Sequence, residues 1–254
     1  MADVVFTVKI DREISTTMSA TTATPTTSSR AIARWTGPAL IAAALVSLIA
    51  EAIVAAAWDR RPYSYIDDYV NFLGSPFAGK FRGVLISSPL WWLMSLAWVV
   101  AGTLVAAASI AVSHRLTGWK QRTVRSLGVA QWTALILFAV FPLDPARFDD
   151  GTLPLYLIGA FVSIIAGNAL AIVTGLSRES LGLPRWFSTV SINLGAIGLV
   201  NIPLTYGWVP TGLAERISLY SYLLWALITG LALIRSAAGE PAPTSAQPRT
   251  SVDK

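Results

Sequence analysis

The chain contains no cysteine and only one histidine, His114, among its 254 residues. Without a thiol the protein forms no disulfide, no iron–sulfur cluster and no cysteine-ligated zinc site, and it has no thiolate nucleophile. A single histidine beside Arg115 argues against a histidine-rich metal site or a histidine-based catalytic triad. The sequence also lacks a Walker loop, a GxSxG elbow, an HExxH pair and a dinucleotide fingerprint. These absences remove many familiar enzyme classes from consideration.

Charged residues are also few, whereas apolar residues are abundant. Charged residues make up 13% of the chain and hydrophobic residues 54%, and the mean hydropathy of +0.59 is far above that of soluble domains. Six apolar runs approach the roughly 20 residues that a helix needs to cross a bilayer. They cover residues 38–58, 90–112, 127–142, 153–174, 186–206 and 217–234. The third run is short, so we expect it to thin the bilayer or to borrow flanking residues such as Ser126 and Phe148.

Stretches such as 40–50 and 96–112 are apolar or small on all faces, which excludes the ten-residue alternation of a transmembrane β-barrel. The sequence therefore predicts an all-α fold: a polytopic membrane protein with a six-transmembrane-helix bundle over residues 35–236. Residues 1–34 and 237–254 are rich in small and polar residues, and we expect them to be disordered cytoplasmic tails. The first span should serve as the insertion signal, and Met18 is a second candidate start.

The basic residues indicate an orientation. Of the 19 Lys and Arg residues, 13 lie before the first apolar run, after the last run, or in the connections that follow the second and fourth runs. The other six lie in the connections that follow the first, third and fifth runs. Those six are mixed with acids, namely Asp59, Asp67, Asp68, Asp144, Asp149, Asp150 and Glu215. The positive-inside rule then places both termini in the cytoplasm and the acidic loops outside the plasma membrane. We do not expect nucleic-acid binding, because the basic residues flank spans and form no aromatic-interleaved patch.

Glu51 is the one acidic residue within a predicted span. A carboxylate at a helix centre costs about 2.5–3.5 kcal/mol on insertion scales, so it is a functional candidate by default. One interpretation is a hydrogen-bond clamp between helices, with Glu51 protonated or salt-bridged. The other is a role in a ligand site or proton path. Arg60 and Arg61 are candidate partners, because their long side chains can reach down from the outer boundary.

The first outer loop, residues 58–89, is the longest connection and carries an aromatic band typical of the headgroup level. Asp67 and Asp68, with Asn71 one helical turn further on, could hold one Mg²⁺ or Ca²⁺ through oxygen ligands. The second outer loop adds Asp144, Asp149 and Asp150. Together the two loops predict an acidic mouth rimmed by aromatic side chains. In the spans, glycines and Asn168 indicate close helix packing or a lined cavity, and Pro203 predicts a kink in the fifth span.

Several short motifs resemble a bacterial six-span membrane family, the domain of unknown function 998. They are Tyr63-Ser64-Tyr65 with Asp68, Asn71-Phe72-Leu73-Gly74, Ser88-Pro89, Phe141-Pro142-Leu143-Asp144, Gly159-Ala160 and Gly167-Asn168. The resemblance covers residues 38–235 and implies a six-helix membrane protein without an assigned biochemistry. Family members often have a histidine three residues before the Gly-Ala pair, where this chain has Tyr156. That difference argues against an imidazole-dependent activity.

Three function hypotheses remain open. The first is binding of a small or lipid-like ligand at the outer mouth, by Glu51, Tyr65, Asp67, Asp68, Asn71, Asp144, Tyr156 and Asn168. The second is a Mg²⁺-dependent intramembrane enzyme acting on a lipid or isoprenoid diphosphate, of the cyclase, transferase or phosphatase type. Its metal would be held by Asp67, Asp68, Asp144 and Asp150, with Glu51, Asp68 and Asp144 as catalytic candidates. The third is a structural or partner-binding membrane subunit.

Overall fold

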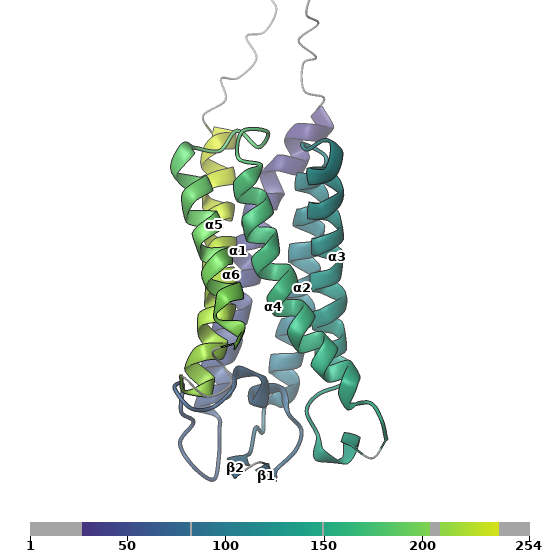
Figure 1. Ribbon diagram of the computed structural model, residues 1–254, viewed down its shortest axis with the longest axis vertical. Helices are drawn as coiled ribbons and strands as arrows, with labels where there is room; N and C mark the ends of the chain where they lie inside the picture. Colours follow the sequence, from purple (N-terminus) through teal and green to yellow (C-terminus); the bar gives the residue numbers. More distant parts are fainter. Residues whose placement is uncertain (1–26, 82, 149, 204–208, 239–254) are drawn as a thin grey trace, which may run out of the picture.

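Six long helices form an antiparallel bundle in the computed structural model (Figure 1). The structure describes residues 27–238 apart from 82, 149 and 204–208, and it leaves the side chains of 27–34, 146 and 148 undescribed. The helices are α1 Thr27–Ala56, α2 Trp91–Ser113, α3 Gly118–Val140, α4 Leu153–Leu176, α5 Arg185–Val200 and α6 Thr211–Ala238. Each helix packs against the next along the chain, and α6 returns to pack against α1. The ring is therefore closed by the first and last helices.

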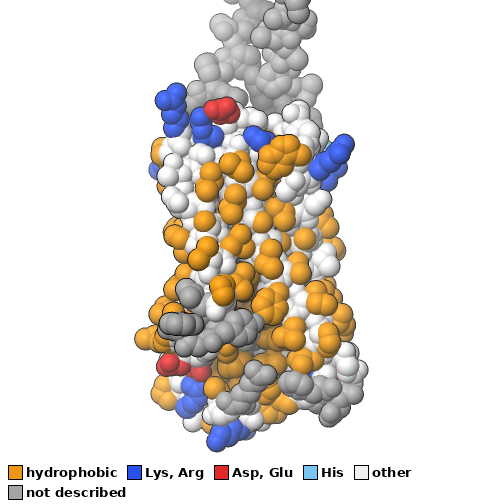
Figure 2. All heavy atoms as spheres, in the orientation of Figure 1, with side chains coloured by type: hydrophobic (Ala, Val, Ile, Leu, Met, Phe, Trp, Pro, Cys, Tyr) orange, Lys and Arg blue, Asp and Glu red, His pale blue; other side chains and the backbone are white. Residues whose placement is uncertain are grey.

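The two ends of the bundle differ in composition. α1 begins and α6 ends at one end, called here the terminal end, together with the short connections 114–117 and 177–184 (Figure 1). The opposite end, called the loop end, carries residues 57–90 and 141–152. Figure 2 shows Lys and Arg side chains around the terminal end and a broad apolar belt between the two ends. An apolar belt between polar ends is the surface that a bilayer requires.

In the described part of the chain, five helices are long and apolar enough to cross a membrane, namely α1, α2, α3, α4 and α6. The sixth, α5, has 16 residues. The expectation of a helical membrane protein is thus confirmed, and its all-α character holds apart from one small hairpin.

Some helix bounds differ from those expected from hydropathy. α3 has 23 residues and gains its length at the terminal end, through a segment that contains Lys120 and Arg125. It does not borrow Phe148, which lies in a separate 3₁₀ turn. Basic side chains fit the end of a membrane helix because their long stems let the charge reach water. In α5 the helix ends at Val200, so Pro203 follows the helix and does not kink it.

The structure describes only part of the two tails that the sequence predicts. α1 begins at Thr27, so residues 27–34, which we assigned to the disordered tail, are helical. Residues 1–26 and 239–254 lie outside the described residues, and with them most of both expected tails and the candidate start at Met18.

Small residues let the helices approach closely. Gly37 of α1 and Gly230 of α6 face each other, and a Cβ on Gly230 would lie 2.6 Å from the Gly37 carbonyl oxygen. Apolar clusters fill the rest of the interior. One, near the terminal end, contains Trp225 and Phe187. The other, near the loop end, contains Trp98. Membrane helices associate through such close packing because lipid tails are as apolar as the side chains.

The long first loop folds over the loop end of the bundle. Its short 3₁₀ helix η1, Val70–Gly74, buries Val70, Phe72 and Leu73 against the helices. A hairpin of β1, Gly79–Phe81, and β2, Val84–Ile86, follows it. The Ser88 hydroxyl donates to the Leu73 carbonyl oxygen at 2.7 Å and fixes the end of η1. The loop thus covers the bundle interior at the loop end.

Substituting Gly230→Val should destabilise the bundle, because its side chain would collide with the α1 backbone. Overpacking of this kind typically costs about 1–3 kcal/mol. The measurement is the melting temperature of the detergent-purified protein. Leu231→Val is the matched control, since Leu231 is 47% exposed on the outer face of the same helix turn. Equal melting temperatures for the two variants would show that the glycine contact is not close.

Candidate functional site

A buried ion pair joins the first and last helices near the loop end. Arg216 of α6 lies 2.9 Å from the Glu51 carboxylate of α1, and both side chains are about 5% exposed or less. The Arg216 Nε donates to Glu51 Oε1 at 3.0 Å, and the Tyr220 hydroxyl donates to Oε2 at 3.1 Å. Glu51 is therefore held by two donors and one counter-charge, and a buried carboxylate requires such partners.

The remaining Arg216 donors bind the first loop. Its Nη1 donates to the carbonyl oxygens of Tyr65 at 2.7 Å and Asp68 at 2.8 Å, and its Nη2 donates to the Tyr63 hydroxyl at 2.5 Å. The guanidinium also lies 4.9 Å from the Tyr65 ring centroid, within cation–π range. Burial raises the pKa of Tyr63, an effect that the charge of Arg216 opposes. Arg216 therefore ties the loop to both helices.

A second ion pair shapes the loop itself. Arg61 binds the Asp68 carboxylate through both terminal nitrogens, at 2.8 and 2.5 Å, and its Nε donates to the Leu85 carbonyl oxygen at 3.1 Å. The Ser64 amide also donates to Asp68, at 2.7 Å. Hydrogen bonding to Asp68 raises the pKa of Arg61. Asp68 is thus engaged in closing the loop.

A third buried acid, Glu215, accepts a hydrogen bond from the first residue of η1. The Val70 amide donates to Glu215 Oε2 at 2.5 Å, and the Asn71 amide is also hydrogen-bonded to this carboxylate. An acid at the start of a short helix satisfies its free amides and complements their dipoles. Among the described residues, no basic side chain lies within ion-pair distance of Glu215. Its charge is therefore met by backbone amides.

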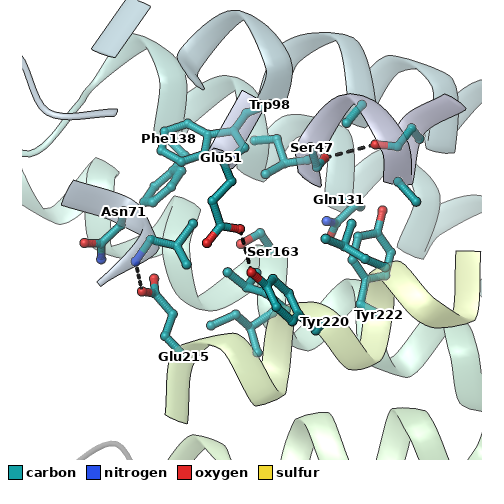
Figure 3. A pocket seen from close by; sticks show the side chains of 18 of the residues that line it. Ser47, Glu51, Asn71, Trp98, Gln131, Phe138, Ser163, Glu215, Tyr220 and Tyr222 are labelled. Atoms are coloured by element: carbon teal, nitrogen blue, oxygen red, sulfur yellow. Dashed lines mark hydrogen bonds between the residues drawn. The ribbon is translucent and has the colours of Figure 1, made fainter. Parts of the chain in front are cut away.

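Beneath η1 lies a cavity enclosed by α1, α2, α3, α4 and α6 (Figure 3). Its volume is about 60 Å³, measured as the space open to the centre of a water-sized sphere. That is enough for a few water molecules or a small polar head, because one water needs about 10–15 Å³ on this measure. The apolar wall includes Met94, Trp98, Leu135 and Phe138. In Figure 3, Glu51, Glu215 and Asn71 lie together at one end of the cavity, and Gln131 and Tyr222 lie at the other.

The cavity lining is not equally buried around the bundle. Its residues from α1, α2 and α3 are all buried, whereas Ala160 and Ile164 of α4 and Leu219, Tyr220 and Leu223 of α6 keep some exposure. The least buried part of the lining therefore belongs to α4 and α6.

Two polar atoms in the wall have no hydrogen-bond partner among the described residues. They are Asn71 Oδ1 and Gln131 Oε1. An unpaired buried acceptor costs about 1–3 kcal/mol, so such atoms often mark the place of a water or a ligand.

The structure brings only part of the predicted ligand set to this cavity. Glu51 and Asn71 line it. Asp68 and Tyr65 are not among the lining residues: Asp68 binds Arg61, and the Tyr65 ring contacts the Arg216 guanidinium. Asp67 is exposed and accepts a hydrogen bond from the Ser64 hydroxyl at 2.8 Å.

The other predicted residues have packing or loop contacts. Tyr156 is buried and stacks on Phe138, with ring centroids 5.1 Å apart. Asn168 donates to the Ser218 carbonyl oxygen at 3.1 Å and so joins α4 to α6. Asp144 is partly buried in the second loop. Asp150 accepts hydrogen bonds from the Thr152 hydroxyl and amide, which lower the pKa of this carboxyl.

The four acids expected to hold a metal do not form a common cluster. Among the described residues no group of three or more His, Cys, Asp or Glu side chains is placed to hold a metal ion. Asp68 is paired with Arg61, and Asp150 hydrogen-bonds to Thr152 at the start of α4. The shared coordination sphere required by the Mg²⁺ hypothesis is therefore not assembled from Asp67, Asp68, Asp144 and Asp150 in the described structure.

Sequence reasoning missed Arg216 and Glu215. Arg60 and Arg61 were two of several candidate partners of Glu51, but Arg61 binds Asp68, and Arg216 binds Glu51. Hydropathy places the start of the sixth apolar run at residue 217, and so places Glu215 and Arg216 in a loop. In the structure α6 begins at Thr211. Pro210, followed by a run without another proline until Pro241, was the available signal for the earlier start.

Replacing Arg216 by methionine should destabilise the protein by about 3–5 kcal/mol, because Glu51 would stay buried without its charge partner. The double variant Glu51→Leu/Arg216→Met should recover part of that loss, since neither side chain is then an unpaired charge. Thermal unfolding of the single and double variants measures the coupling. Arg60→Met, at an exposed position, is the control. Arg216→Met as stable as Arg60→Met would show that the pair does not hold the loop.

One comparison with known proteins identifies the family of the chain. No curated protein and no solved structure matches the chain. A family model described as a protein of unknown function, DUF998, matches residues 41–232, which include all the helices described above at least in part. The family expected from the short motifs is therefore confirmed. The chain belongs to the DUF998 family and is a helical integral membrane protein.

Proposed function

We propose that the protein binds a small or lipid-like ligand in the cavity beneath η1. The observation that carries this proposal is an apolar cavity whose wall contains two buried oxygens, Asn71 Oδ1 and Gln131 Oε1, with no partner in the described part of the chain. A cavity that served packing alone would be filled or lined by apolar atoms, since unpaired acceptors destabilise the fold.

The wall divides into a polar and an apolar part, as a site for an amphiphile does. Glu51, Glu215 and Asn71 line the loop end, and Trp98, Leu135 and Phe138 line the side (Figure 3). Ligand sites are typically apolar with a few placed polar groups that fix orientation. A polar head near Glu51 and an apolar tail along the aromatic wall fit this division.

The ligand enters from the membrane. The partly exposed lining residues of α4 and α6 face the belt that lipid would cover, and η1 caps the cavity at the loop end. The water-exposed mouth expected from the loops is thus replaced in this proposal by a side entrance, and the loops act as a cap.

We further propose six membrane crossings, with the terminal end in the cytoplasm and the loop end outside the plasma membrane. α4 ends and α6 begins at opposite ends, so α5 and the residues after it must return across the bundle (Figure 1). The 16 residues of α5 span about 24 Å at 1.5 Å each, somewhat less than the bilayer core of about 30 Å. The excess of basic residues at the terminal end supports the orientation.

The orientation can be tested cleanly because the chain has no cysteine of its own. Ala78→Cys places a thiol at an exposed position of the loop end, and Ser180→Cys places one at an exposed position of the terminal end. A membrane-impermeant maleimide should label Ala78→Cys in intact cells and Ser180→Cys only after the membrane is opened. The reverse labelling would invert the proposed orientation.

Ligand binding can be tested by closing the side entrance. Ala160→Phe should block the opening between α4 and α6 and lower the amount of small amphiphile that copurifies with the protein, measured by mass spectrometry of the extracted ligand. Ala52→Phe, on the exposed face of α1, is the matched control and should leave that amount unchanged. Equal ligand content in wild type, Ala160→Phe and Ala52→Phe would contradict a ligand in this cavity.

A further inference from the structure

We propose that the ligand head bound in this cavity is a protonated amine, so that the ligand is an ammonium-bearing amphiphile. This inference rests on the proposed function and adds the chemistry of the ligand head. It follows from which polar atoms face the cavity, which of their protons are already used, and which charges line the wall.

Oxygen acceptors dominate the polar part of the wall. The two unpartnered atoms, Asn71 Oδ1 and Gln131 Oε1, both accept hydrogen bonds and donate none. Carboxylate oxygens of Glu51 and Glu215 add further acceptor capacity, because one carboxylate offers about four lone-pair positions. Gln131 lies at the opposite end of the cavity from Asn71 and the two acids, so a ligand head near Glu51 must donate hydrogen bonds to Asn71 Oδ1 and to the carboxylates (Figure 3).

The hydroxyl protons around the cavity are largely used by the protein itself. Ser47 donates to the carbonyl oxygen one turn earlier at 3.0 Å, and Ser163 donates to the Ala160 carbonyl oxygen at 2.8 Å. Tyr220 donates to Glu51 at 3.1 Å. Because each hydroxyl has one proton, these three groups can offer a ligand only their oxygen lone pairs.

The charges in the wall are negative. Glu51 and Glu215 line the cavity, whereas Arg216 does not. The guanidinium reaches from Glu51 into the first loop, where its Nη1 donates to the carbonyl oxygens of Tyr65 and Asp68. Among the described residues Glu215 has no basic partner, so a cation bound beside it would supply the missing counter-charge, and low dielectric strengthens that attraction.

The same wall disfavours an acidic head. A carboxylate, phosphate or diphosphate would meet two carboxylates and unpaired oxygens. Like charges within a few ångströms in a buried site are costly. This argues against a diphosphate lipid as the ligand of this cavity. A primary ammonium carries three N–H donors and one positive charge, and so matches both properties of the wall.

The size of the cavity fits a head group and its first carbons. About 60 Å³ is too small for a whole lipid, so the rest of the chain would lie in the opening between Ala160 and Ile164 on one side and Leu219 and Leu223 on the other. The aromatic wall beside the head, Trp98 and Phe138, covers the carbons next to the nitrogen.

The test uses the full-length protein in phosphatidylcholine nanodiscs at pH 7, with three ten-carbon probes: decylamine, decanol and decanoate. Each probe is titrated against wild type and Ala160→Phe while the melting temperature is recorded, so that general partitioning into the lipid is subtracted. Decylamine should stabilise wild type by a few degrees at saturation and bind at least about tenfold more tightly than decanol or decanoate.

Glu215→Gln removes one negative charge and keeps an oxygen for the Val70 amide. It should reduce the preference for decylamine over decanol about tenfold while leaving decanol binding unchanged. Asp67→Asn, at an exposed carboxylate outside the cavity, is the matched control and should keep the wild-type preference. If Glu215→Gln does not fold, Glu51→Gln takes its place, because the amide oxygen can accept from Arg216 while the amide NH2 donates to the Tyr220 hydroxyl oxygen.

The outcomes separate the two proposals. Tighter binding of decylamine that is lost in Ala160→Phe supports both. Decanol or decanoate binding as tightly as decylamine in wild type, but not in Ala160→Phe, overturns the ammonium head and leaves the ligand site standing. No difference between wild type and Ala160→Phe for any probe overturns the site itself and the ammonium proposal with it.

Discussion

The buried pair of Glu51 and Arg216 is the interaction on which the loop end of this protein depends. Taking both charges out of water is costly, and the cost is offset because Arg216 finds acceptors in α1, in its own helix and in the first loop. The guanidinium fork thereby fixes three chain segments that are far apart in sequence.

Glu215 completes this arrangement from the neighbouring position of α6. It accepts the Val70 amide and so holds η1 over the cavity, while Arg216 holds the turn before η1. The two adjacent residues thus point in different directions, one to the cavity wall and one to the loop. This division turns Arg216 toward Glu51 and the loop and leaves Glu215 on the cavity wall without a basic partner among the described residues, which is the basis of the ammonium proposal.

Hydropathy predicted the helices well and the site poorly, for identifiable reasons. The run 153–174 corresponds closely to α4, Leu153–Leu176, because a membrane helix must be apolar along its length. α3 was predicted too short because its first turns contain Lys120 and Arg125, which lower the hydropathy of any window. The start of α6 was missed for the same reason, and this hid Arg216 as the partner of Glu51. Pairwise contacts such as Arg61 with Asp68 have no signal in a single sequence.

The sequence alone determined that this is a helical membrane protein with a buried acid at Glu51 and long loops on one side, because length, apolarity and charge placement are local properties. Only the tertiary structure decided which charges meet, that η1 caps the bundle, and that Asn71 and Gln131 face one cavity. Those facts depend on how helices rotate and cross, which small residues such as Gly37 and Gly230 set through packing. Packing joins residues distant in the chain, so no local pattern reports it.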